Sequence, residues 1–185
     1  MKQKLLLFIG IILMFAVAMT GCGNKTATEE TTTAEATTVE APIETDYRLY
    51  EDVINSLEDG TYYAFADMSK DHDALLVATE TFDDLDGSKN ATEAIVYGLD
   101  KEGKVKEYGT IESGGTANPI AAKDGYVYYG GHHYITKATI KEAKSKLDVN
   151  RVDEVIGGTE EENQEFNALY DEYFDATVIV FMEAE

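Results

Sequence analysis

An uninterrupted apolar run near the start of the chain limits how much of it can form a folded domain. Residues 5–19 read LLLFIGIILMFAVAM and follow Lys2 and Lys4. A helix that spans a bilayer needs about 20 such residues, whereas a positive start before an apolar run of about 7–15 residues is typical of a secretory signal peptide. We therefore interpret residues 1–21 as a signal peptide and expect the folded domain further along the chain.

The apolar run ends in Met19-Thr20-Gly21-Cys22, and Cys22 is the only cysteine of the 185 residues. This ending resembles the lipobox of bacterial lipoproteins, in which an apolar residue and two small residues precede a cysteine. The resemblance implies that Cys22 is lipidated, becomes the mature N-terminus and anchors the exported protein to the outer face of the cell membrane. Two acyl chains give stable anchoring. The alternatives are an ordinary signal peptide with a chance cysteine, or an uncleaved anchor.

Residues 22–46 differ in composition from the rest of the chain. Of the 24 residues that follow Cys22, eight are Thr, six are acidic and none is aromatic. Such a segment cannot bury enough apolar surface to offset the entropy of ordering it. We expect a disordered linker here and a single folded domain over residues 47–185.

Acidic residues outnumber basic ones in the chain as a whole. The totals are 36 Asp and Glu against 15 Lys and Arg, which give a net charge of −21. Residues 47–185 hold 30 of the acids and 12 of the bases. Binding to nucleic acid requires a concentrated basic face, and docking on anionic lipid requires basic segments. The composition argues against both kinds of partner, apart from the membrane held through the lipid on Cys22.

The hydrophobic pattern of residues 47–185 predicts an α+β domain with a mostly antiparallel sheet and a helix at each end. Helical spacing marks 47–57, and Thr159 with Glu162 forms a capping-box pattern before a second helix whose apolar residues include Tyr170 and Phe174. Strands are expected at 61–66, 74–82, 93–99, 104–111, 120–122, 126–129, 134–140 and 147–152. Asp124-Gly125 is a hairpin signal, and KEAKSK at 141–146 would also accept a helix. The apolar run 176–182 is typical of a central strand.

Two acidic loops carry oxygen-bearing side chains at alternate positions, as a calcium site requires. The candidate ligands are Asp67, Ser69, Asp71 and Asp73 in the first loop and Asp84 and Asp86 in the second. The first loop resembles a degenerate form of the D-x-D-G-D-x-x-x-L loops of calcium-binding repeats, with Lys70 in place of the Gly. The alternative is a pair of solvated turns, because Asp, Asn, Ser and Gly are common turn residues. We expect turns and, at most, one weakly bound calcium as a cofactor.

The tyrosines and histidines of residues 126–133 form the second candidate site. Tyr126 and Tyr128 share one face of a predicted strand, and an exposed tyrosine face could stack a sugar or hold a peptide. His132 and His133 follow Gly130-Gly131, and their spacing gives no metal site. The Gly114-Gly115 and Gly130-Gly131 pairs are expected at bulges or close backbone approaches, because neither opens a helix. Simple packing of the tyrosines within the fold is the alternative.

Sequence signatures of an enzyme are absent from the chain. The only cysteine is assigned to the anchor, Ser113 lies in IESGG rather than in G-x-S-x-G, and H-E-x-x-H does not occur. We therefore expect a non-enzymatic domain without catalytic residues.

The segments YAFADMSKDHDALLVAT, ESGGTANPI, KDGYVYYGGHHYITK and ATVIVF resemble parts of uncharacterised cell-surface lipoproteins of clostridia-like Gram-positive bacteria. The resemblance implies an envelope lipoprotein with one small β-rich domain, and it assigns no catalytic residues. The function expected is binding of a peptide, a glycan or an envelope protein. The alternatives are a structural subunit of an envelope complex or a hydrolase acting on envelope or glycan substrates.

Overall fold

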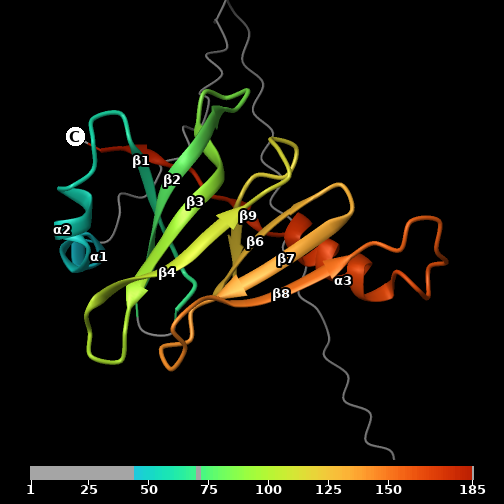
Figure 1. Cartoon of the computed structure of the whole chain (residues 1–185). Helices are drawn as coiled ribbons and strands as arrows, with labels where there is room; N and C mark the ends of the chain where they lie inside the picture. Colours follow the sequence, from blue (N-terminus) through green and yellow to red (C-terminus); the bar gives the residue numbers. More distant parts are fainter. Residues whose placement is uncertain (1–43, 70–71, 185) are drawn as a thin grey trace, which may run out of the picture. The chain divides into compact units, whose positions relative to one another are not determined.

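The computed structural model describes residues 44–69 and 72–184, which include most of the predicted folded domain (Figure 1). It confirms the α+β class with mostly antiparallel strands. The elements are α1 (Glu44–Leu49), α2 (Glu51–Ile54), β1 (Tyr62–Ala66), β2 (Ala74–Asp83), β3 (Lys89–Leu99), β4 (Val105–Glu112), β5 (Ala121–Lys123), β6 (Tyr126–Gly131), β7 (Tyr134–Thr139), β8 (Asp148–Asp153), α3 (Gln164–Phe174), β9 (Thr177–Val178) and β10 (Met182–Glu183).

The strands form two five-stranded antiparallel sheets that share one apolar core. The first sheet has the order β10-β1-β2-β3-β4 and the second has the order β8-β7-β6-β5-β9. Successive side chains of a strand point to opposite faces. One face of each sheet therefore contributes to the shared core, as Leu76 and Val96 do from the first sheet and Val127 and Ala138 do from the second.

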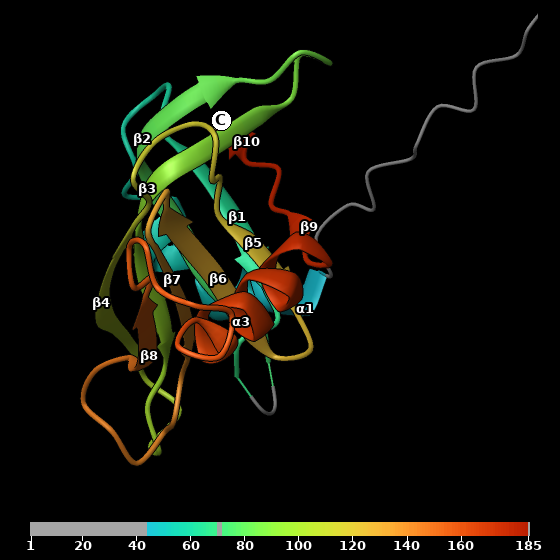
Figure 2. The same cartoon turned by 90° about the vertical axis from the view of Figure 1, so that its right-hand side faces the viewer.

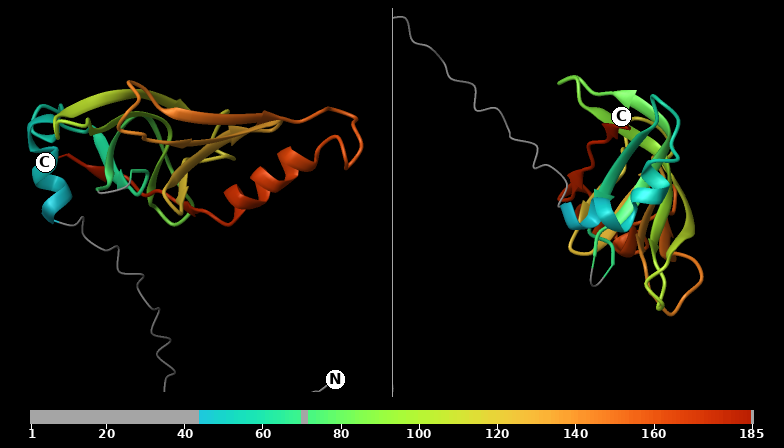
Figure 3. Two further views of the ribbon diagram at one scale, coloured as in Figure 1. Left: turned by 90° about the horizontal axis from the view of Figure 1, so that it is seen from below. Right: turned by 90° about the vertical axis from the view of Figure 1, so that its left-hand side faces the viewer.

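The helices pack on the two outer faces of the sheets. Tyr50 of the short N-terminal helical segment packs with Leu75 and Val77 on the first sheet, and the Tyr50 hydroxyl donates to the carbonyl of Asp73 at 2.9 Å. Phe166 and Leu169 of α3 pack on the second sheet. Figure 2 shows α3 in front of the second sheet, and the left view of Figure 3 shows α1 and α3 at opposite ends of the domain.

The predicted turns of the second sheet are present. Asp124 and Gly125 have φ values of 51° and 80°, which are the positive values that a tight hairpin turn between β5 and β6 requires. The segment 141–146 forms turns rather than a helix, so β7 and β8 make the expected hairpin. Thr159 and Glu162 form the capping-box hydrogen bonds, but residues 160–163 are turns and regular helix begins only at Gln164.

Two glycine pairs allow a close backbone approach, as the sequence predicted. The amide of Gly114 donates to the carbonyl of Gly130 at 2.7 Å. A Cβ on Gly130 would lie 2.5 Å from the carbonyl oxygen of Tyr134, and one on Gly114 would lie 3.0 Å from the Cα of Gly131. Only glycine fits at these contacts without a shift of the backbone.

The prediction of a central strand at 176–182 is wrong. The segment forms two edge strands of two residues each, β9 on the second sheet and β10 on the first. Between them Ile179 and Phe181 enter the shared core, whereas Val180 is 42% exposed. The amides of Ile179 and Phe181 donate to the carbonyls of Ile120 and Lys89. The apolar composition therefore reflects a segment that passes from one sheet to the other along the rim of the core.

The C-terminal helix buries only some of the apolar residues that mark it in the sequence. Phe166, Leu169 and Tyr173 are buried, whereas Tyr170 is 36% exposed and Phe174 is 77% exposed. Helix α3 covers only part of the outer face of the second sheet, so residues at the margin of its apolar stripe stay in contact with solvent.

Candidate functional site

A tyrosine–lysine–glutamate network marks the margin of α3 on the second sheet. Tyr128 of β6 is 2% exposed, and its hydroxyl donates to Oε2 of Glu172 on α3 at 2.9 Å. Nζ of Lys137 on β7 donates to the same oxygen at 2.5 Å. Lys137 also lies over the ring of Tyr126, 4.1 Å from its centroid. The network holds Lys137 at the margin of α3, where the outer face of the second sheet becomes open to solvent.

Beyond α3 the same face of the sheet contains a hollow of about 360 Å³, which we call the tyrosine hollow. Its lining residues are Tyr126, Lys137, Thr139, Lys141, Asp148, Val149 and Asn150. The register pairs Lys137 with Asn150 and Thr139 with Asp148, so strand pairing places these side chains next to one another. An aromatic ring, hydroxyl, amide and carboxylate groups and two ammonium groups therefore converge on one hollow.

Asp148 is the carboxylate of the tyrosine hollow, and it binds the amino groups of both Lys141 and Lys144. These two hydrogen-bonded ammonium groups lower the pKa of Asp148 below its usual value. Asp148 is therefore ionised at neutral pH, where it accepts hydrogen bonds and does not release a proton.

A second hollow, of about 670 Å³, adjoins the first, and we call it the loop hollow. Its lining residues are Tyr108, Gly109 and Thr110 of β4 together with residues 143–149. The amide of Leu147 donates to the carbonyl of Tyr108 at 3.1 Å, which holds the β7–β8 loop against β4. Asp148 and Val149 line both hollows, so the two lie on either side of the start of β8.

The charge around the hollows differs from that of the rest of the domain. Their lining residues include four lysines and one carboxylate, and a second carboxylate, Glu172, binds Lys137. Residues 47–185 as a whole hold 30 acidic and 12 basic residues. The hollows are therefore a locally basic region of a strongly acidic protein. The lysines are Lys137, Lys141, Lys144 and Lys146.

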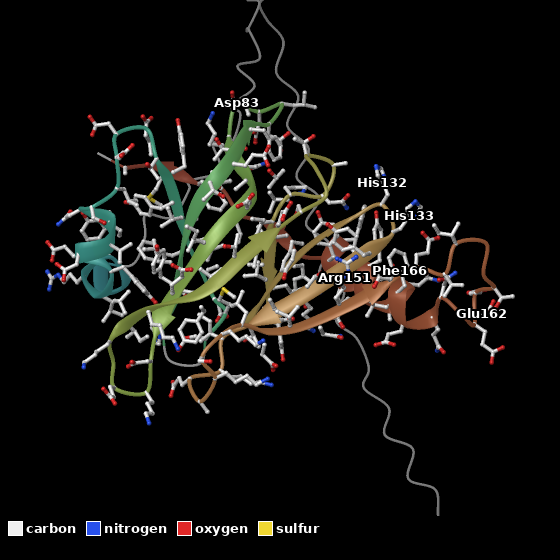
Figure 4. The ribbon with its side chains drawn as sticks, viewed as in Figure 1. Asp83, His132, His133, Arg151, Glu162 and Phe166 are labelled. Carbon is white, nitrogen blue, oxygen red and sulfur yellow. The ribbon has the colours of Figure 1, made fainter. Side chains whose placement is uncertain are left out.

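The structure does not bring the four residues of the predicted tyrosine–histidine site together. Tyr126 lines the tyrosine hollow, whereas Tyr128 shares its strand face but is buried beneath α3. His132 and His133 form the turn at the opposite end of the β6–β7 hairpin, and their side chains project outward there (Figure 4). Nδ1 of His133 lies 2.6 Å from Oε2 of Glu154. Of the predicted binding residues, Tyr126 alone belongs to the candidate site.

The side chains of the acidic loops engage the chain itself. Oδ1 of Asp84 accepts from the amide of Leu85, and its Oδ2 accepts from Asn90 at 3.0 Å. Asp86 accepts from the amide of Ser88 at 2.8 Å, which also lowers the pKa of Asp86. These are the hydrogen bonds of a tight hairpin turn.

The first acidic loop shows a similar use of its side chains. Oγ of Ser69 donates to the carbonyl of His72 at 2.7 Å, and Asp67 is exposed. Across residues 44–69 and 72–184, no three His, Cys, Asp or Glu side chains are grouped so as to hold a metal ion. Asp71 lies outside the described residues, as does Cys22. Calcium binding through Asp73 and its neighbours stays a prediction.

The lysines of the candidate site were missed from the sequence, although a signal was present. Five of the 12 basic residues of the domain lie within residues 137–151, which begin at Lys137 and end at Arg151. The net charge of the whole chain hides this local reversal. The pairing of β7 with β8 then brings the basic residues of this segment close together on one surface.

Comparison of the chain with family models, with curated proteins and with solved structures gives no match. In the part of the chain that the structure describes, no helix has the length and apolar character needed to cross a membrane.

Replacing Glu172 with glutamine is expected to lower the melting temperature at neutral pH and to have little effect near pH 3. The hydrogen bond from Lys137 is the main cause of the lowered pKa of Glu172. A carboxyl group with a lowered pKa stabilises the fold above its ordinary pKa of 4.5 and loses that effect as the pH falls through its folded value. Thermal denaturation at pH 7 and pH 3 measures the difference.

The exposed Asp171 on the same helix provides the control for this prediction. Asp171→Asn should leave the melting temperature within about 1 °C of wild type at both pH values, since isolated surface charges contribute little. An equal loss of stability at pH 7 and pH 3 in Glu172→Gln would mean that packing, and not the charge on Glu172, accounts for the effect.

Proposed function

We propose that this protein is a membrane-anchored extracytoplasmic lipoprotein whose non-enzymatic domain binds glycans at the tyrosine hollow. The lipobox resemblance at Cys22 and the Thr- and Glu-rich composition of residues 23–46 support display on a tether outside the cell. The observation that carries the binding role is the convergence of Tyr126, Asp148 and Asn150 on one hollow.

The chemistry of the tyrosine hollow favours a glycan over a peptide. Aromatic rings such as that of Tyr126 provide an apolar surface with a polar edge, which suits the alternating C–H and O–H groups of a sugar. Asp148 accepts hydrogen bonds, Thr139 and Asn150 both donate and accept, and Val149 is the aliphatic residue of the lining. Peptide grooves rely instead on apolar pockets for anchoring side chains. At about 360 Å³, the hollow falls within the range of small-ligand sites.

The state of Asp148 supports binding rather than hydrolysis. A glycoside hydrolase uses two carboxyl groups, one of which acts as an acid with a raised pKa. Asp148 is the carboxylate that lines the tyrosine hollow, and its pKa is lowered by Lys141 and Lys144. Among the residues that line this hollow, Asp148 is the one carboxyl group, and it does not have the raised pKa that a glycosidase acid needs.

A structural role in an envelope complex is the second candidate, and a different surface favours it. Phe174 at the end of α3 is 77% exposed, and Val178 and Val180 near the edge strand β9 are 36% and 42% exposed. If this role holds, chemical crosslinking in intact cells should join the protein to one specific envelope protein. Recovery of uncrosslinked monomer alone would count against it.

Membrane anchoring is tested with Cys22→Ala in the full-length protein. We expect wild type in the membrane fraction and the variant either unprocessed or released into the medium, because the variant lacks the thiol that carries the lipid. Normal processing and membrane association of the variant would show that Cys22 is not the anchor.

Glycan binding is tested by co-sedimentation of the mature chain carrying Cys22→Ala with purified Gram-positive cell walls. We expect the protein to pellet with the walls and Tyr126→Ala to remain in the supernatant. Tyr170→Ala, which removes an exposed tyrosine of α3, is the control and should pellet like wild type. Melting curves confirm that each variant is folded. Failure of the folded wild-type protein to pellet would refute glycan binding.

A further inference from the structure

The loop hollow extends the candidate site and contains a lysine, Lys146, that is free of ion pairs among the described residues. Lys144 and Lys146 line it from the β7–β8 loop, and Asp148 is the carboxylate in its lining. Asp148 binds both Lys141 and Lys144, so one negative charge faces two positive ones. Lys146 forms no ion pair within the described part of the chain. Residues 141–148 hold three lysines and two acids, Glu142 and Asp148, so this segment keeps one positive charge in excess.

We propose that the glycan is a linear anionic polymer, with a sugar unit in the tyrosine hollow and carboxylate or phosphate groups at the lysines of the loop hollow. This inference rests on the proposed function and names its ligand class. The two hollows share Asp148 and Val149, so successive units of one chain can reach both. Each hollow is lined by two lysines, and Lys137 of the tyrosine hollow is held by Glu172 whereas Lys146 of the loop hollow forms no ion pair within the described residues.

The overall charge of the protein makes the local reversal informative. At −21, the chain repels polyanions over long distances. Because the protein is strongly acidic, a cluster of lysines around a hollow is not what its overall composition would produce. Short-range attraction at these lysines can compensate for the repulsion only where they cluster.

The test compares cell walls before and after acid extraction of their covalently attached anionic polymers. The mature chain carrying Cys22→Ala is expected to bind intact walls at least tenfold more tightly than extracted walls. In the double variant Lys144→Gln/Lys146→Gln this preference should fall by about tenfold, the loss expected from two exposed ion pairs. Binding by wild type should also weaken as salt is raised, because salt screens charge attraction.

Lys101→Gln/Lys104→Gln is the matched control. Both lysines lie in or next to the β3–β4 turn, and their removal changes the net charge by the same amount. The control should bind intact walls like wild type. Equal binding of wild type to intact and extracted walls would overturn the anionic ligand while leaving glycan binding in place. An unchanged preference in Lys144→Gln/Lys146→Gln would overturn the assignment of the loop hollow.

Competition with defined polymers separates the two anion chemistries. Polygalacturonate carries carboxylates and synthetic poly(glycerol phosphate) carries phosphates. The polymer that releases the protein from intact walls identifies the anion, with fully methyl-esterified pectin as the uncharged match for polygalacturonate. Release by methyl-esterified pectin as effective as release by polygalacturonate would overturn the proposal, because that polymer lacks the charge that the lysines are proposed to bind.

Discussion

Phe181→Ala is expected to lower the free energy of unfolding by about 3–5 kcal/mol, the usual cost of emptying an aromatic site in a core. Phe181 is 3% exposed and lies in the core shared by both sheets. Its amide also donates to the carbonyl of Lys89 at 2.7 Å, so the backbone around it is fixed and cannot easily collapse into the cavity. Urea denaturation of wild type and variant, followed by tyrosine fluorescence, measures the loss.

The neighbouring Val180 is the control for this prediction. Its side chain is 42% exposed, so Val180→Ala should cost less than about 0.5 kcal/mol. A loss below about 1 kcal/mol for Phe181→Ala would contradict the position of this segment between the sheets, because it would mean that the ring is not buried in the folded protein.

Gly130→Ala is expected to destabilise the fold by about 3 kcal/mol, the upper end of the cost of overpacking. The added Cβ would lie 2.5 Å from the carbonyl oxygen of Tyr134 and 3.2 Å from the Cα of Ile135. Both are backbone atoms of the paired strand β7, so relief of the clash requires the hairpin to open. The hydrogen bond from the amide of Gly114 to the carbonyl of Gly130 would be strained as well.

Gly103→Ala separates this clash from the general cost of replacing a glycine. Gly103 has a φ of 75° and no atom within 4 Å of an added Cβ, so its replacement carries only the left-handed backbone penalty of about 1 kcal/mol. Urea denaturation should rank Gly130→Ala as clearly more destabilising than Gly103→Ala. Equal losses would show that close packing of Gly130 against β7 does not constrain the fold.

The fold class and the strand positions were predictable from the sequence because they depend on local patterns. Alternation of apolar residues marks the strands, Asp124-Gly125 marks a hairpin, and the paired glycines mark close approaches. The number of sheets was not predictable in this way. Which strands share a sheet is decided by long-range pairing, such as that of Tyr62 with Glu183.

The candidate site depended on the same long-range information. Tyr126 was identified because tyrosines on one strand face are visible in the sequence. The sequence did not reveal that Tyr128 is buried beneath α3 or that Lys137 contacts Glu172. Both features depend on a helix that lies far along the chain. The central strand predicted at 176–182 was wrong for a related reason. A segment between two sheets buries alternate residues as a strand does, although most of it pairs with neither sheet as a regular strand.

The pairing of β10 with β1 means that the first sheet cannot be completed until residues 182–183 have been synthesised. Strand β1 is synthesised well before its partner and completes its pairing only with residues 182–183, and Phe181 joins the core shared by the two sheets equally late. An incomplete chain therefore has an open edge on the first sheet and an unfilled place in its interior. If the proposed signal peptide directs export, the chain crosses a membrane before it folds, and such a fold postpones the stable native state until residues 181–183 have been translocated.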